Sequence, residues 1–278
     1  MPELPEVEVT RRALQPHVLG QTVTQCIVRQ GQLRYPVAPE LASLGGQSIV
    51  AVQRRGKYLI LEFSSGALIV HLGMTGTLRY FTAMRPPQRH DHVDFLFSSG
   101  ALLRYHDPRR FGALLWITRH EENMTTPFWE IHPCFTPLGV EPFDAMFDGD
   151  FLYRRTRGLQ CAIKPLLLQG KLVVGAGNIY ACESLFQAGI DPRRGAGRIG
   201  RERYGRLASA VRTVLGQAIE AGGSSLRDFV DASGNTGYFQ LQHQVYGRTG
   251  QSCVRCGGPI RHMRQGQRST WFCPDCQR

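Results

Sequence analysis

The chain has 278 residues, with 33 lysines and arginines against 22 aspartates and glutamates, and therefore a formal net charge of +11. It contains no long apolar run and begins with an acidic, amphipathic segment, which excludes a membrane-spanning or secreted protein and predicts a cytoplasmic one. The positive charge indicates a polyanionic partner such as nucleic acid, and the length favours two domains over one.

The first predicted element is an amphipathic helix over residues 5–17, which follows Pro2 and Glu3. If Met1 is removed, Pro2 becomes a secondary amine at the N-terminus. An α-amino group titrates near pH ~8, so a fraction is unprotonated at neutral pH and can attack a sugar aldehyde carbon to form an imine. Glu3 and Glu6 flank this amine within one helical turn. The alternative is that proline and glutamate simply begin a helix here.

Short β-rich runs with turn signals between them occupy residues 22–118. They read TVTQCIVR, SIVAVQRR, KYLILEF, ALIVHL, GTLRYF, HVDFLF, ALLRYH and GALLWIT. The segments Ser64-Ser65-Gly66 and Ser98-Ser99-Gly100 supply turns between apolar runs. Eight short strands at this spacing predict an N-terminal β-sandwich or barrel.

Lysine is rare in this arginine-rich chain, where only Lys57, Lys164 and Lys171 occur. Arginine serves wherever a permanent cation suffices, including bidentate phosphate contacts. The few lysines are therefore candidates for tasks that need an ammonium group able to lose its proton. Lys57, the only lysine in the first 163 residues, is our candidate acid/base.

A proline- and glycine-interrupted stretch over residues 119–150 separates the strands from a half with helical periodicity. The helical pattern covers residues 150–157, 161–169, 178–188 and 201–221. We predict an N-terminal domain, a linker, a helical domain and a C-terminal module, with the boundaries 1–135, 136–149, 150–246 and 247–278.

The strongest local motif is a pair of Cys-x-x-Cys sequences in the C-terminal module, with sixteen residues between them. Each pair can chelate one side of a tetrahedral zinc ion, and the intervening segment suits a β-hairpin. Two disulfides are the alternative, which is poor for a cytosolic chain. The zinc ligands are Cys253, Cys256, Cys273 and Cys276.

Two further segments are weaker signals. In GAGN, Gly175 and Gly177 precede Asn178, which we expect to cap the following helix and to leave free amides that bind phosphate; a tight turn is the alternative. In HDPRRFG, Arg109 and Phe111 lie on a loop between strands. An arginine beside an exposed aromatic ring can fill the space left by an extruded base, although a surface arginine with a core phenylalanine is the simpler interpretation.

The chain resembles bacterial formamidopyrimidine-DNA glycosylases along essentially its whole length. The motifs PELPEVE, QRRGKYL, HLGMTG, HDHVD, DPRRFG, AIKPLLL, KLVVGAGNIYACE, QVYGR and the four-cysteine tail occur in this order. The resemblance implies an α+β multidomain fold: an N-terminal eight-stranded β-sandwich with a helix, a helical domain with a helix–two-turn–helix motif, and a β-hairpin zinc finger. It also implies a monomer that binds damaged double-stranded DNA across the cleft between the halves.

Catalytic roles follow from the same resemblance, residue by residue. Pro2 would form the imine with C1′ of the damaged nucleotide. Glu3 would transfer a proton during sugar-ring opening, with Glu6 supporting that site. Lys57 matches the acid/base lysine of β-elimination, and Arg268 matches the arginine linked to the second elimination and to phosphate binding. The expected outcome is release of an oxidised purine followed by β,δ-elimination.

DNA contacts are implied in the same way. Met74, Arg109 and Phe111 match the residues that fill the space left by the flipped nucleotide. The DNA backbone would be contacted by His90, Arg109, Lys164 and Asn178.

The chain departs from the family pattern at Leu159, in a stretch that is more basic in many relatives, and at Asn235-Thr236, where relatives often carry Lys-Pro. The connection around ENMTTPFWEIHPCF is also longer than usual. Two other functions remain open: an endonuclease VIII-like glycosylase for oxidised pyrimidines, and a non-catalytic zinc-finger DNA-binding protein. The second leaves Pro2, Glu3 and Lys57 unexplained.

Overall fold

The computed structural model describes residues 2–120, 127–223 and 243–278. These residues form two compact units. The first contains the described residues up to Thr136 together with Gly222 and Gly223, and the second contains Pro137–Ala221 and residues 243–278.

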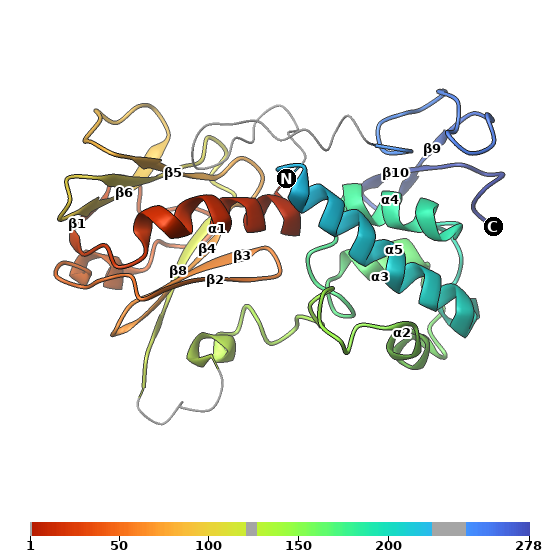
Figure 1. Ribbon diagram of the computed structural model, residues 1–278, viewed down its shortest axis with the longest axis horizontal. Helices are drawn as coiled ribbons and strands as arrows, with labels where there is room; N and C mark the ends of the chain where they lie inside the picture. The colour runs from red at the N-terminus through yellow and green to blue at the C-terminus, as the bar shows by residue number, and fades with distance from the viewer. Residues whose placement is uncertain (1, 121–126, 224–242) are drawn as a thin grey trace. The chain divides into compact units, whose positions relative to one another are not determined.

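The first unit is built from one long helix and two antiparallel four-stranded sheets (Figure 1). One sheet has the strand order β1 (Val23–Val28), β6 (Asp91–Phe97), β7 (Leu102–His106) and β5 (Thr77–Phe81). The other has the order β2 (Ala51–Arg55), β3 (Tyr58–Glu62), β4 (Gly66–His71) and β8 (Ala113–Thr118). The predicted β-rich runs therefore all form strands, and the sheets make a sandwich rather than a closed barrel.

The core of the first unit reflects the two periodicities of its sequence. In the β3–β4 pair, Leu59 faces Val70 and Leu61 faces Leu68, and all four side chains belong to the same buried cluster. Helix α1 (Leu4–Val18) contributes Val7, Leu14 and Val18 to this cluster, and it packs against β2, β3 and β5. Alternate strand residues and one helical face thus share a single core, which anchors the start of the helix to the sandwich.

The second unit contains four α-helices and a β-hairpin among its described residues. The helices are α2 (Gly149–Thr156), α3 (Ile163–Leu168), α4 (Asn178–Ala188) and α5 (Arg201–Glu220), close to the predicted ranges. The hairpin pairs β9 (Arg261–Gln265) with β10 (Arg268–Phe272). Short 3₁₀ helices lie at Pro39–Ser43 and Phe128–Ile131 in the first unit and at Ala196–Arg198 in the second. None of the helices in the described ranges is long and apolar enough to span a membrane.

Local signals explain where these helices begin and end. Asp148 caps α2 through a hydrogen bond in which its Oδ1 accepts the backbone N–H of Phe151 at 2.6 Å. Helix α4 ends at Ala188, and the following Gly189 caps it with a left-handed φ of 69°, which suits glycine. Asn178 is a correction to the sequence interpretation: Gly177 is the cap residue of α4, and Asn178 is the first residue inside the helix.

Candidate active site

The start of α1 holds Pro2, Glu3 and Glu6 together in a buried setting. Glu3 and Glu6 are each 2 % exposed, and the backbone N–H of Glu3 donates to Glu6 Oε2 at 2.8 Å. Gly223 lies against this turn, because a Cβ built on it would stand 3.2 Å from Glu6 Oε1. Glu6 Oε2 therefore lies beside the peptide bond that joins Glu3 to Pro2, the residue that would carry the nucleophilic amine. Gly223 is a neighbour of this turn that the sequence interpretation did not include.

Lys57 occupies the second position of the tight turn between β2 and β3. Arg55 pairs with Tyr58 in the strand register, so Gly56 and Lys57 form a two-residue loop, and Gly56 has the positive φ of 56° that such turns require at their first position. On β2, Arg54 Nε donates to Glu8 Oε2 of α1 at 3.2 Å. This ion pair ties the strand that leads to Lys57 to the helix that begins beside Pro2.

His71, which the sequence interpretation missed, lies close to Lys57. Burial, followed by the charges of Lys57 and Arg34, lowers the pKa of His71 from 6.5 to about 4. The imidazole is therefore neutral at pH 7, and its Nδ1 accepts the backbone N–H of Gly73 at 3.1 Å. His71 thus connects the surroundings of Lys57 to the turn that carries Met74.

The long connection after β8 packs onto the same hairpin. Trp129 is 3 % exposed, and its Nε1 donates to Glu62 Oε1 at 2.9 Å. The ring of Phe135 lies 5.4 Å from the ring of Trp129 and 5.3 Å from that of Tyr58, the residue after Lys57. This part of the connection is therefore a covering layer for β3, a role that its sequence alone did not indicate.

Met74, Arg109 and Phe111 come together on two adjoining loops. A Cβ built on Gly73 would lie 2.4 Å from the backbone carbon of Phe111, so the two loops touch through their backbones. The guanidinium of Arg109 stands 4.6 Å from the centre of the Phe111 ring, and Phe111 is 45 % exposed. Phe111 is therefore an exposed ring beside a cation and not a core phenylalanine. This is the arrangement expected of residues that fill the space left by an extruded base.

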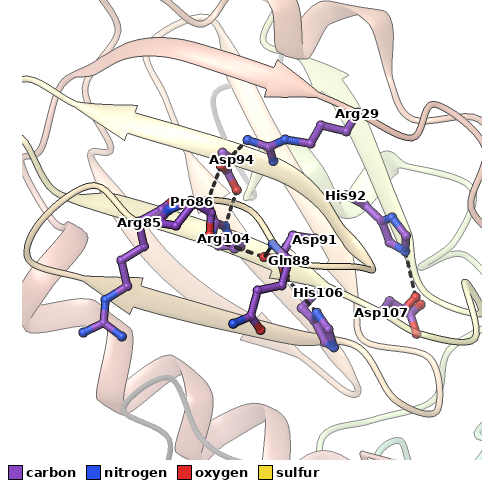
Figure 2. Close-up of polar contacts among 10 residues, drawn as sticks. All are labelled: Arg29, Arg85, Pro86, Gln88, Asp91, His92, Asp94, Arg104, His106 and Asp107. Atoms are coloured by element: carbon purple, nitrogen blue, oxygen red, sulfur yellow. Dashed lines mark hydrogen bonds and ion pairs between the residues drawn. The ribbon is translucent and has the colours of Figure 1, made fainter.

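His90 directly precedes β6 and follows a loop that a buried ion-pair network holds in place. Figure 2 shows this network around Arg104 and Asp94. Arg104 pairs with Asp94 at 2.7 Å and donates to the carbonyl oxygens of Arg85 and Pro86 at 2.9 and 3.1 Å. His90 has a φ of 74°, unusual for a residue with a side chain. The network fixes the loop, and with it the place from which His90 projects.

The second unit joins the other predicted DNA-contact residues. Lys164 is fully buried, and its Nζ donates to Asn178 Oδ1 at 2.6 Å, to Thr270 Oγ1 at 2.8 Å and to the Ser269 carbonyl at 3.1 Å. Asn178 Nδ2 donates to the same carbonyl at 2.9 Å. Ser269 follows the exposed Arg268 on β10. Lys164 and Asn178 therefore hold the strand that presents Arg268, which explains why Asn178 does not cap its own helix.

The four C-terminal cysteines lie within 4.8 Å of one another through their sulfur atoms. The Sγ atoms of Cys253 and Cys276 are 3.9 Å apart, and those of Cys256 and Cys273 are 3.5 Å apart. Tetrahedral Zn–S bonds of about 2.3 Å place the sulfurs about 3.8 Å from one another, and no disulfide joins them. The donor set fits one structural zinc ion, as predicted.

Of the two places where the sequence departs from the family pattern, the structure describes one. Leu159 is 36 % exposed in the turn after α2. Asn235-Thr236 lies outside the described residues.

Comparison with protein families divides the chain into three matched regions. Residues 1–114 match the N-terminal domain of formamidopyrimidine-DNA glycosylase, residues 138–230 match its H2TH domain, and residues 250–278 match the zinc finger found in FPG and IleRS. A β-sandwich joined to an H2TH domain and a four-cysteine finger defines the class: a DNA repair glycosylase with a structural zinc.

Curated relatives extend the likeness over the full length. The formamidopyrimidine-DNA glycosylases of Burkholderia thailandensis and Ralstonia nicotianae are 53 % and 52 % identical, with 100 % of each chain covered. The MutM (FPG) crystal structure from Thermus thermophilus has a TM-score of 0.86 at 40 % identity, covering 99 % of this chain and 98 % of that one. A point mutant of Lactococcus lactis FPG, in complex with DNA containing Fapy-dG, has a TM-score of 0.89 at 35 % identity over 99 % of both chains. The chain belongs to the formamidopyrimidine-DNA glycosylase family, and base-excision repair of damaged DNA is its function.

Proposed function

We propose that this protein excises oxidised purines, 8-oxoguanine and formamidopyrimidines, from duplex DNA and then cleaves the strand at the resulting abasic site. The observation that carries the proposal is the buried turn in which Glu3 and Glu6 adjoin Pro2, on a helix tied to the strand before Lys57. A relative of 35 % identity crystallised with Fapy-dG DNA supports the choice of substrate.

The chemistry begins at Pro2. Its secondary amine, freed by removal of Met1, attacks C1′ of the damaged nucleotide with its lone pair, and the bond from C1′ to the base breaks. The base leaves with the bonding electrons and takes up a proton, while Glu3 protonates the ring oxygen so that the sugar opens. Once the Pro2 nitrogen has given up its own proton, its lone pair forms the C=N bond as the bond from C1′ to the ring oxygen breaks, and the product is a positively charged imine between the Pro2 nitrogen and C1′. Glu6 accepts the Glu3 backbone N–H and so holds Glu3 in place.

The imine makes the C2′ proton acidic, and two eliminations follow. Lys57 acts as the acid/base, because an ammonium group can lose and regain a proton at neutral pH when its surroundings favour it. Loss of the C2′ proton expels the 3′ phosphate, and a second elimination expels the 5′ phosphate. Arg268, held by the Lys164–Asn178 cluster, stabilises the departing phosphate charge.

The remaining assignments belong to the same proposal. Met74, Arg109 and Phe111 fill the space left by the extruded nucleotide, and His90 contacts the DNA backbone. Lys164 and Asn178 contribute to phosphate binding near Arg268. We further propose a monomer that acts in the bacterial cytoplasm, associated with the nucleoid. The domain boundaries at 135, 149 and 246 stay a prediction.

Oxidised pyrimidines are the second candidate substrate. The wild-type Lactococcus lactis Fpg, 36 % identical over 99 % of both chains, has been crystallised with DNA containing an oxidised pyrimidine. The two candidates differ in the lesion and share the Pro2 chemistry.

The test is a panel of duplexes that carry 8-oxoguanine, a formamidopyrimidine or an oxidised pyrimidine opposite each base, with borohydride trapping at the same sites. We expect a trapped covalent adduct and faster cleavage at the purine lesions. A version with one residue left before Pro2 is the control, since its amide nitrogen cannot attack and no adduct should form. Trapping by that blocked version would contradict the role of Pro2, and faster cleavage of pyrimidine lesions would favour the second candidate.

A further inference from the structure

Asp107, at the end of β7, is fully buried and joins both loops that carry Met74, Arg109 and Phe111. Its Oδ1 accepts the hydroxyl of Thr75 at 2.6 Å and the backbone N–H of Arg109 at 3.3 Å. Its Oδ2 accepts the backbone N–H of Gly112 at 2.9 Å. One carboxylate thus bonds to the residue after Met74, to Arg109 itself and to the residue after Phe111.

The backbone of Asp107 reaches the His90 loop as well. Its N–H donates to the His90 carbonyl at 3.1 Å, and its carbonyl accepts from His92 Nε2 at 2.8 Å, the contact drawn in Figure 2. Below the carboxylate, Tyr105 donates its hydroxyl to Oδ2 at 3.2 Å. Burial, together with the charge of Asp107, raises the pKa of Tyr105, so this tyrosine remains a donor at neutral pH.

The glycines of the two loops lie too close to neighbouring atoms to be replaced by a larger residue. A Cβ at Gly112 would lie 1.8 Å from the Tyr105 hydroxyl oxygen, and a Cβ at Gly76 would lie 2.8 Å from the same atom and 2.4 Å from the Leu72 carbonyl. Close backbone approach through glycines therefore packs the two loops tightly against each other. Their hydrogen bonds converge on Asp107.

We propose that Asp107 is the positioning residue that holds Met74, Arg109 and Phe111 in the arrangement needed to fill the space left by an extruded nucleotide. This inference rests on the proposed function, because it takes those three residues as the ones that enter the DNA. Asp107 acts through the loops and does not itself contact DNA or the reacting atoms.

Asp107→Asn is the sharpest substitution, because it keeps the size of the side chain while it removes the charge and replaces one acceptor oxygen with a donor nitrogen. An amide oxygen in place of Oδ1 still accepts from Thr75 and Arg109. The amide nitrogen in place of Oδ2 then faces the N–H of Gly112, donor against donor, and the loop must shift. The residues of the proposed chemistry, Pro2 and Lys57, are untouched.

Thr75→Val is a milder companion, since it removes the hydroxyl that bonds to Asp107 and keeps the shape. Thr77→Val is its matched control in the same chain. Thr77 is 1 % exposed, and its hydroxyl has no hydrogen-bond partner within the ranges that the structure describes. The Thr75 hydroxyl donates to Asp107 and also accepts the backbone N–H of Arg109 at 3.3 Å, so a difference between the two valine variants reports the hydrogen bonds that join Thr75 to Asp107 and Arg109.

The experiment measures each variant on two substrates: a duplex with 8-oxoguanine and a single-stranded oligonucleotide with an abasic site, which has no opposite base and no space to fill. Fluorescence of 2-aminopurine next to the lesion reports nucleotide extrusion. We expect Asp107→Asn to lower duplex excision and the fluorescence rate by about tenfold or more, equivalent to about 1.4 kcal/mol of barrier, and to change single-strand cleavage by less than about twofold. Thr75→Val should show a smaller loss of the same kind, and Thr77→Val none.

Phe111→Ala completes a double-mutant cycle. If Asp107 acts through the loops, Asp107→Asn combined with Phe111→Ala loses less activity than the product of the two single fold-losses, because part of what Asp107 positions is already missing. Additive losses, or equal losses of Asp107→Asn on both substrates, would overturn the proposal. Should Asp107→Asn fail to fold, the pair of threonine variants decides, and equal behaviour of that pair overturns it. Failure of the proposed function is separate, because the wild type would then not excise 8-oxoguanine from the duplex.

Discussion

Replacement of Glu8 by glutamine tests how the helix behind Pro2 is attached to the strand before Lys57. Glu8 is 8 % exposed and is the common partner of three arginines. Its Oε1 accepts from Arg11 and Arg12 at 2.9 Å, and its Oε2 accepts from Arg54 on β2 at 3.2 Å. Glutamine keeps the shape and removes the charge, so three guanidinium groups lose their shared counter-ion.

The pKa of Glu8 sets the size of the stability loss that we expect in Glu8→Gln. Burial by itself raises it, but the hydrogen bonds from Arg11 and Arg12 and the charges of Arg11 and Arg54 together lower it from 4.5 to about 2. At 1.36 kcal/mol per pKa unit, the upper bound is about 3.4 kcal/mol, and screening by solvent at the arginine ends reduces it to about 1–3 kcal/mol. Because the folded-state pKa is lowered, this stability is fully present above pH 4.5 and is lost as the pH falls toward 2.

The assay is urea unfolding of the wild type and Glu8→Gln at pH 7, 4.5 and 3.5. We expect the variant to be less stable by about 1–3 kcal/mol at pH 7, with the difference shrinking by roughly a third or more at pH 3.5. Glu202→Gln is the control: it removes an exposed i,i+4 pair with Arg206 at 2.6 Å, which contributes about 0.3–0.5 kcal/mol. An equal loss at all three pH values, or a loss no larger than that of the control, would refute the reasoning.

Three further perturbations address the chemistry, the finger and the connection. Lys57→Arg keeps the charge without the titratable group, so turnover should fall about 10²- to 10⁴-fold while DNA affinity changes far less; equal losses would favour a purely electrostatic role. Chelation of zinc should unfold the finger and abolish incision. Arg268→Ala should retain the metal, weaken damaged-DNA binding and lower the salt dependence of that binding by about one phosphate contact. Metal-free, disulfide-bonded cysteines in active protein would contradict this. Trp129→Ala should cost about 3–5 kcal/mol in calorimetry, since it empties a buried site and removes a hydrogen bond to Glu62; a loss under about 1 kcal/mol would show that the connection is not a covering layer.

Much of the candidate site was predictable because its signals are local. The spacing of Cys253, Cys256, Cys273 and Cys276 is set by the geometry of one tetrahedral ion, and the rarity of lysine drew attention to Lys57. Asn178 shows the limit of local reasoning. As a residue type it favours a cap, but a partner fourteen positions earlier, Lys164, engages its side chain instead.

Residues that sequence reasoning missed, such as Asp107 and Trp129, have hydrogen-bond partners distant in the chain. Asp107 bonds to Thr75, and Trp129 bonds to Glu62, separations of 32 and 67 residues. The sequence around His71 gives no sign that the imidazole is neutral, because its pKa depends on burial and on the charge of Lys57. Such contacts depend on which strands become neighbours, and strand order is a property of the whole sheet.

The sequence by itself determined the strands, the helices and the metal site of this protein, because alternation, helical periodicity and ligand spacing act within a few residues. Only the tertiary structure decided how Asp107 joins two loops, how Glu8 ties α1 to β2, and how Lys164 holds the strand that presents Arg268. The physical reason is that a hydrogen bond between buried groups exists only once the elements that carry them have packed, and packing is decided by the sum of many side chains rather than by any one segment.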